Sequence, residues 1–169
     1  MITIRPARDG DLDGFLTLAA QVEHWFGPMV EEPGFHRAVE AHIRTGAALI
    51  AEATEPAAPS AGASGPVGGL LFGADPPTYH VHWLVTAAQC RGAGVGRRLM
   101  AEAMRRYVSG PGTVEVVTFG PDHPGAVESG ARAFYERLGF APGEPTYPGP
   151  EGGSRQIYRL DVPADVRAV

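Results

Sequence analysis

The feature that most constrains this chain is a glycine-rich stretch near its middle, Arg91-Gly92-Ala93-Gly94-Val95-Gly96-Arg97. Side chains that alternate from one face to the other predict a strand over 79–86 before it, and helical spacing predicts a helix over 94–108 after it. Alternating glycines let the backbone turn tightly and leave no Cβ in the way of a ligand. The first turn of the helix adds unpaired N–H groups and the positive end of a dipole. Because the flanking arginines are also positive, the sequence predicts a site for a pyrophosphate.

The spacing of this stretch excludes two other phosphate-binding loops. A Walker loop needs Gly-Lys-Ser or Gly-Lys-Thr, whereas Gly96 is followed by Arg97-Arg98. A dinucleotide-binding loop has Gly-x-Gly-x-x-Gly after the first strand, whereas this chain has Gly-x-Gly-x-Gly in its middle. A flexible glycine turn with solvated arginines stays open as the alternative when the stretch is considered by itself.

Positive charge is concentrated around the glycine-rich stretch. Five arginines fall within residues 91–106 of a chain whose net charge is −5. An acidic protein does not favour non-specific contacts with nucleic acid or anionic membranes, so we expect neither partner and an anionic ligand instead. One cysteine, Cys90, precludes an internal disulfide. With no signal peptide and no apolar run of about 18 residues, a cytoplasmic location is expected.

Strand and helix patterns alternate along the chain and predict one mixed α/β domain over 1–169. Strands are expected over 1–5, 47–53, 67–72, 79–86 and 114–119, from Phe140 onward and over 155–162. Helices are expected from a cap at Asp9 or Asp11 through Val22 to a break at Gly27-Pro28, and over 33–46, 94–108 and 126–138. The Pro- and Gly-rich segment 54–66 is expected to be a mobile loop between two hairpin strands.

A second motif, Phe134-Tyr135-Glu136-Arg137-Leu138-Gly139-Phe140, ends the amphipathic helix that follows the predicted strand 114–119. Together with the stretch 84–100, which is similar to an Arg/Gln-x-x-Gly-x-Gly/Ala motif, it resembles the GCN5-related N-acetyltransferase (GNAT) family. The opening Ile4-Arg5-Pro6-Ala7 resembles the usual start of that family, so the resemblance covers nearly the whole chain. It implies a central, mostly antiparallel sheet of six to seven strands, splayed between strands 4 and 5 and flanked by about four helices.

The resemblance implies that acetyl-coenzyme A (acetyl-CoA) is the donor. In the family, backbone N–H groups of the loop bind the pyrophosphate, which assigns this role to Arg91, Gly92, Ala93, Gly94, Val95, Gly96 and Arg97. The free backbone of the splayed fourth strand pairs with pantetheine and polarises the thioester carbonyl, which assigns those roles to Leu84 and Val85. Phe134 of the second motif is expected to contact the cofactor.

Tyr135 matches the family tyrosine that protonates the leaving thiolate as a general acid. The alternative is that Tyr135 only packs beside coenzyme A. One departure from the family pattern is Glu128, which stands where an asparagine often begins the later helix and touches the cofactor. We therefore do not assign that contact to Glu128.

A base is needed because an amine with a pKa of about 10 is protonated at neutral pH. His80 and His82 are two residues apart on one predicted strand and therefore lie on the same face. The pair resembles the arrangement in arylalkylamine N-acetyltransferases, where it serves proton removal, and histidine titrates near working pH. The alternative is that both are hydrogen-bonded core or edge residues. Metal binding by the pair would need further ligands, and the sequence offers no matching cluster, so no metal is expected.

The acceptor amine is expected between the first two helices and a late Gly- and Pro-rich loop over 146–154, which contains Tyr147. His24, Trp25 and Glu31 lie at that junction in the sequence, where an aromatic ring beside a carboxylate can receive a cation. The alternative is that residues 23–26 are the buried end of an amphipathic helix. The expected acceptor is a small-molecule or peptide amine, and members of the family often form homodimers.

The sequence thus favours an enzyme that transfers an acetyl group directly from acetyl-CoA to a primary amine in a ternary complex. Cys90 beside the loop is better explained as incidental than as a nucleophile. A longer acyl-CoA is a second candidate donor. The alternative from a different class is a non-catalytic acyl-CoA sensor or regulatory module, which the departure at Glu128 keeps open.

Overall fold

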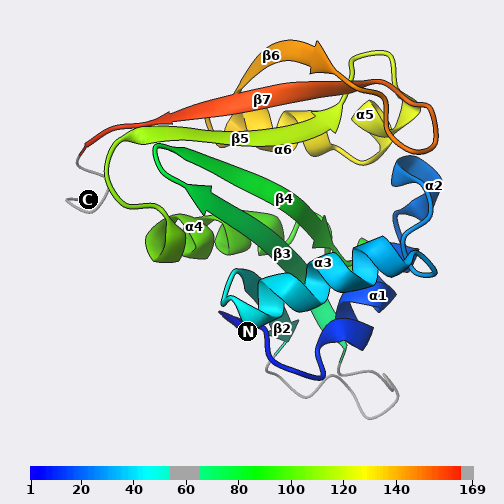
Figure 1. Cartoon of the computed structure of the whole chain (residues 1–169). Helices are drawn as coiled ribbons and strands as arrows, with labels where there is room; N and C mark the ends of the chain where they lie inside the picture. The colour runs from blue at the N-terminus through cyan, green and yellow to red at the C-terminus, as the bar shows by residue number, and fades with distance from the viewer. Residues whose placement is uncertain (54–64, 165–169) are drawn as a thin grey trace.

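The computed structural model describes residues 1–53 and 65–164. A seven-stranded sheet runs through them in the order β1-β2-β3-β4-β5-β7-β6, and neighbouring strands are antiparallel except for the parallel pair β4 and β5. The strands are β1 (Ile2–Pro6), β2 (Ala48–Ala53), β3 (Pro66–Asp75), β4 (Thr78–Thr86), β5 (Gly112–Phe119), β6 (Ala141–Thr146) and β7 (Arg155–Val162). The helices are α1 (Leu12–Ala20), α2 (Glu23–Phe26), α3 (Pro33–Arg44), α4 (Val95–Tyr107), α5 (Pro124–Glu128) and α6 (Ala131–Arg137), with a 3₁₀ turn at Ala88–Cys90. The predicted mixed α/β fold with a mostly antiparallel sheet is therefore confirmed (Figure 1).

Helices cover both faces of the first half of the sheet (Figure 1). α1 and α3 pack on one face and α4 on the other, and the closest approach is at β3. A Cβ atom on Gly68 would lie 2.7 Å from Val95 Cγ1 of α4, and one on Gly69 would lie 2.9 Å from Phe15 Cε1 of α1. The two glycines therefore let one helix on each face rest directly on the strand backbone.

The sheet divides where β4 and β5 meet. The two strands pair only over residues 78–81 and 113–116, so the last five residues of β4 separate from β5. This is the splay that the resemblance implies. It leaves the backbone at the end of β4 without a neighbouring strand on that side.

A β-bulge at His82 changes the direction of the side chains along β4. The pairing with β3 advances by only one residue between Val81 and Trp83, so His82 is the extra residue. Val81 and Leu84 both pack in the core beside α4, whereas Trp83 packs against α1 and α3. The strict alternation expected over 79–86 is therefore wrong beyond Val81.

Two of the expected helices are each divided into two shorter ones. The first ends at Ala20, and α2 follows as a separate turn. The helix expected over 126–138 is divided into α5 and α6 at Gly130, whose φ of +70° lies in the left-handed region. Asp11 precedes α1 as expected, but its carboxylate accepts hydrogen bonds from Arg5 instead of capping the helix.

Most of the segment 54–66, expected as a loop, lies outside the described residues, which resume at Gly65. The strands on either side of it, β2 and β3, are antiparallel neighbours, as a hairpin requires. None of the helices described is both long and apolar enough to span a membrane.

Candidate functional site

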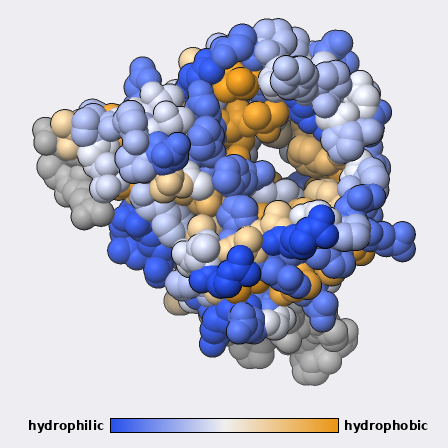
Figure 2. Space-filling view, viewed as in Figure 1, coloured by the Kyte–Doolittle hydropathy of each residue, from blue (hydrophilic) through white to orange (hydrophobic). Residues whose placement is uncertain are grey.

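A cavity of about 420 Å³ lies where β4 separates from β5. Its lining comes from α2, the end of β4, the glycine-rich stretch with the start of α4, and α6 with the turn before it. The lining residues are Val22, Trp25, Phe26, Leu84, Val85, Thr86, Arg91, Gly92, Gly94, Val95, Gly96, Arg97, Ser129, Gly130, Ala131, Phe134, Tyr135, Arg137 and Leu138. Figure 2 shows the molecule hollowed between the two halves of the sheet, with hydrophobic residues gathered beside the hollow.

The cavity brings together nearly all the residues predicted to bind the cofactor. The exception is Ala93, whose N–H donates to the carbonyl of Cys90 over 3.2 Å and so closes the turn. Two segments far apart in the sequence, the glycine-rich stretch and the second motif, thus line one cavity.

The glycines of this stretch meet two different requirements. Gly92 and Gly94 have φ angles of +81° and +82°, a region that other residues rarely adopt. Gly94 directly precedes α4, so the unpaired N–H groups of the first helical turn begin at the cavity. Gly96 instead makes room for α6, because a Cβ atom there would lie 3.1 Å from the ring of Phe134.

Tyr135 lines the cavity and is only 6% exposed. Its ring makes edge contacts with Phe134 and Phe140, with ring centres 5.0 and 5.4 Å apart. Burial raises the pKa of the Tyr135 hydroxyl well above its usual value, so the group keeps its proton at neutral pH. Among the described residues no hydrogen-bond partner for this hydroxyl is found, which leaves it able to donate a proton to a group in the cavity.

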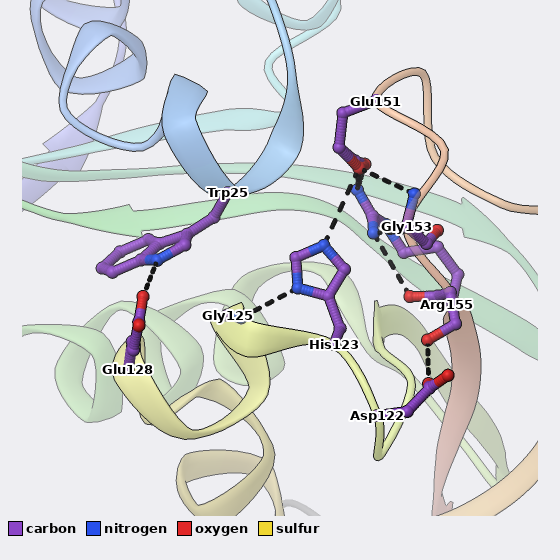
Figure 3. A network of polar contacts seen from close by, with 9 residues as sticks. Trp25, Asp122, His123, Gly125, Glu128, Glu151, Gly153 and Arg155 are labelled. Carbon is purple, nitrogen blue, oxygen red and sulfur yellow. Dashed lines mark hydrogen bonds and ion pairs between the residues drawn. The ribbon is translucent and has the colours of Figure 1, made fainter.

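Trp25 is the one predicted acceptor residue that lines the cavity, and it is 7% exposed. Its Nε1 donates to Glu128 Oε2 over 2.9 Å (Figure 3). The guanidinium of Arg91 lies 4.8 Å from the centre of the Trp25 ring. His24 is exposed with its ring against that of Trp25, and Glu31 is exposed away from the lining. α2, α5 and the glycine-rich stretch therefore meet at the indole of Trp25.

His80 and His82 do not line the cavity. His82 Nδ1 lies 2.9 Å from Nε2 of His42 on α3, and His80 Nδ1 lies 3.7 Å from Glu115 Oε1 on β5. Burial, followed by the positive charges of His42 and His80, lowers the pKa of His82, so this ring is neutral at neutral pH and can accept a proton. Within residues 1–53 and 65–164, no group of three or more His, Cys, Asp or Glu side chains could hold a metal ion.

A polar network beside the cavity was not predicted from the sequence (Figure 3). His123 Nδ1 accepts from the N–H of Gly125 over 2.8 Å, and its Nε2 lies 3.8 Å from Glu151 Oε2. Glu151 in turn pairs with the buried guanidinium of Arg155, the first residue of β7. No local sequence pattern predicts this network, because its members come from the turn before α5, the late loop and β7.

The same network joins the two halves of the splayed sheet. The guanidinium of Arg155 lies 5.7 Å from the ring centre of Phe26 on α2 and 5.1 Å from that of Phe119 on β5. A Cβ atom on Gly27 would lie 3.1 Å from Pro150 of the late loop. α2 and the late loop therefore form a bridge, here called the α2–loop bridge, across the open end of the splay.

Comparison with protein families places these features in a known context. Residues 45–142 match the family model described as an acetyltransferase (GNAT) domain. A comparison with curated proteins found no match.

Solved structures with a similar fold include several N-acetyltransferases. A chain of the NatC complex bound to Gag peptide and CoA has a TM-score of 0.68 at 16% identity, over 95% of this chain and 98% of that one. PaiA N-acetyltransferase from Thermoplasma acidophilum in complex with coenzyme A has a TM-score of 0.67 at 15% identity, over 96% and 99%. The ribosomal-protein-S18-alanine N-acetyltransferase from Escherichia coli has a TM-score of 0.63 at 16% identity, over 100% and 99%. At these identities the likeness shows a shared fold.

Proposed function

The chain belongs to the GNAT acetyltransferase family, and we propose that it transfers an acetyl group from acetyl-CoA directly to a primary amine in a ternary complex. The observation that carries the proposal is the cavity at the splay. There the unpaired end of β4, a glycine turn at the start of a helix and a buried, protonated tyrosine line one space.

In this proposal the glycine-rich stretch and β4 hold the donor. Residues 91–97 bind the pyrophosphate through backbone N–H groups at the positive end of α4, with Arg91 and Arg97 adding charge. The free edge of β4 at Leu84 and Val85 binds pantetheine as an added strand would bind. Backbone N–H groups there stabilise the negative charge that develops on the thioester oxygen. Phe134 packs beside the donor.

Tyr135 and a histidine of β4 handle the protons. As the amine nitrogen bonds to the acetyl carbon and the carbon–sulfur bond breaks, Tyr135 gives its hydroxyl proton to sulfur. The buried setting that raises the pKa of Tyr135 also disfavours a thiolate, so the sulfur needs that proton. His82 or His80 removes the proton of the amine, and burial, which lowers the pKa of His82, keeps that ring neutral at neutral pH.

The acceptor in this proposal is a small-molecule or peptide amine that approaches past α2 and the late loop. Trp25 with Glu128 offers an aromatic ring beside a carboxylate, a combination that suits a cationic amine. Exposed His24, whose ring lies against that of Trp25, and exposed Glu31, which does not line the cavity, are the further residues proposed to contact the amine as it enters. A peptide is proposed as an acceptor alongside small-molecule amines, because one complex with a similar fold is bound to Gag peptide. We also propose that residues 1–169 form one domain and that the protein is cytoplasmic. A homodimer is proposed as well, and light scattering tests it.

The test is release of free thiol from acetyl-CoA in the presence of a broad amine panel. The panel contains small primary amines, peptides with free N-termini and peptides with an internal lysine, each beside its N-acetylated form as control. We expect turnover with one class and a mass increase of one acetyl group on that acceptor. If calorimetry shows that the protein binds coenzyme A tightly, but no amine of the panel is acetylated and longer acyl-CoA donors give no turnover either, the non-catalytic acyl-CoA sensor is supported instead.

A further inference from the structure

Three histidines from two elements form a cluster beside β4. His80 and His82 lie on β4, and His42 lies in the last turn of α3. The rings of His80 and His82 stack with their centres 5.8 Å apart, and His42 Nε2 lies 2.9 Å from His82 Nδ1. The ring of His82 lies over Gly73 of β3, where a Cβ atom would overlap it. The bulge, the glycine and His42 together fix the position of the His82 ring.

The hydrogen bonds of this cluster determine which nitrogen of each ring carries a proton. His42 Nδ1 lies 2.6 Å from the carbonyl oxygen of Ala38, which can only accept, so His42 donates from Nδ1. In neutral His42, Nε2 is then an acceptor, and His82 must donate to it from Nδ1. Neutral His82 accordingly has its lone pair on Nε2, and no hydrogen bond to that atom is found within the described part of the chain.

The groups around His82 influence how readily its ring takes up a proton, and together with burial its histidine neighbours lower its pKa. His80 and His42 are the titratable groups in contact with it, and Glu115, paired with both His80 and Arg159, lies one step further away. His42 sits in the last turn of α3, where the partial negative charge of the helix end stabilises a proton held between the two rings.

We propose that His42 is a positioning residue that holds His82 in the tautomer whose Nε2 is free to take the proton of the acceptor amine. The inference rests on the proposed transfer reaction with His82 as its base. A proton leaves the amine nitrogen and binds His82 Nε2, while the Nδ1–H of the resulting imidazolium stays donated to His42. Because a strand rises about 3.3 Å per residue, His82 stands about 7 to 10 Å from the backbone of Leu84 and Val85, a gap that one or two water molecules bridge.

The tautomer can be measured without turnover, by ¹⁵N NMR of the histidine rings in the full chain at a pH where the rings are neutral. In the wild type we expect His82 to be protonated on Nδ1 and unprotonated on Nε2. In His42→Phe, which keeps a ring but removes the acceptor, we expect signals of both tautomers. A wild-type His82 that carries its proton on Nε2 overturns the proposal.

Activity separates positioning from a merely structural role. We expect His42→Phe to lower kcat about ten-fold with KM for acetyl-CoA unchanged, since a general base contributes about 10²–10⁴-fold in total. His42→Gln, whose amide oxygen can accept from His82 Nδ1, should restore most of kcat. His36→Gln is the matched control, because His36 lies on the same helix outside the cluster.

Equal kcat in the wild type, His42→Phe and His42→Gln also overturns the proposal. If the phenylalanine variant does not fold, the wild-type tautomer and the glutamine variant decide instead. A wild type that binds coenzyme A but acetylates no amine contradicts the proposed function by itself, because the NMR measurement does not depend on turnover.

Discussion

Single residues of the cavity carry distinct physical requirements. Gly92 and Gly94 are glycines because of their backbone conformation, whereas Gly96 is a glycine because the ring of Phe134 packs on it. Substitutions at these positions therefore fail for different reasons. At Gly94 the surrounding space is open, so the effect of a side chain on the ligand can be tested there.

We predict that Gly94→Asp weakens coenzyme A binding about 100-fold more than Gly94→Asn does. Aspartate and asparagine have the same size and both tolerate the left-handed region, so the two variants differ in charge. If the glycine-rich stretch holds the pyrophosphate, the carboxylate lies near like charges, which costs several kcal/mol. Isothermal titration calorimetry measures the difference, and equal affinities of the two variants contradict the pyrophosphate assignment.

Tyr135 carries a prediction about rate. If Tyr135 is the proton donor, Tyr135→Phe should lower kcat about 100-fold and leave coenzyme A affinity unchanged, because the variant loses only the hydroxyl group. Since the pKa of Tyr135 is raised, its ionisation should not reduce the wild-type rate up to about pH 10. Steady-state kinetics across pH measures both effects. Tyr107→Phe is the control. The pKa of Tyr107 is also raised, but its hydroxyl donates to the carbonyl of Gly46 outside the cavity. Equal rates of the two variants refute the role of Tyr135 as the acid.

At the scale of elements, the α2–loop bridge is the contact that spans the splay. Arg155 is 7% exposed and has Phe26 and Phe119 beside its guanidinium and Glu151 as its counter-charge. Removal of the arginine leaves Glu151 without its main partner and the two aromatic rings without the guanidinium. Arg159, four residues along the same strand, pairs with Glu144 and Glu115 but has 36% of its side chain exposed.

We predict that Arg155→Ala lowers the free energy of unfolding by about 2 to 3 kcal/mol, because a buried ion pair is broken on one side. Arg159→Ala, the matched control on an exposed pair, should cost less than about 1 kcal/mol. Urea unfolding measures both. In the proposed enzyme Arg155→Ala should also raise KM for the acceptor and not for acetyl-CoA. Similar losses of unfolding free energy in Arg155→Ala and Arg159→Ala would show that the α2–loop bridge contributes no more stability than an exposed ion pair.

The types of the elements could be predicted from the sequence, and several of their junctions could not. Side-chain patterns place α3, α4 and six of the strands close to their observed bounds, and for β6 they place the start. It does not place the break at Gly130 or the bulge at His82, because both depend on which partner strand or helix the segment meets. The pattern of β4 reads as simple alternation, and only its pairing with β3 shows that His82 is the extra residue.

At the scale of the whole molecule, paired carboxylates link stability to pH. Hydrogen bonds from Arg5 lower the pKa of Asp11 below its usual 3.8, and those from Arg159 lower the pKa of Glu144 to about 2. A carboxyl whose pKa is depressed by folding stabilises the protein above its unfolded pKa and loses that effect as pH falls through the folded value. Acid should therefore destabilise this fold from about pH 4 downward.

We predict that Asp11→Asn has a flatter dependence of the free energy of unfolding on pH between about 5 and 2 than the wild type. At pH 5 the free energy of unfolding of the variant should be about 1 to 2 kcal/mol below that of the wild type, the size of a charge-assisted hydrogen bond. This difference should shrink toward pH 2. Denaturant unfolding at stepped pH measures this. A constant difference between wild type and variant across the range refutes the link to Asp11.

The sequence by itself determined the glycine turn that lines the cavity and the helix that follows it. A left-handed turn and the start of a helix depend on contiguous residues, so Gly92, Gly94 and the first turn of α4 could be recognised locally. Tertiary structure decided the rest: the contact of Trp25 with Glu128, the pairing of His82 with His42 and the α2–loop bridge. Each joins segments from different elements, and such contacts exist only after the chain has brought distant residues together.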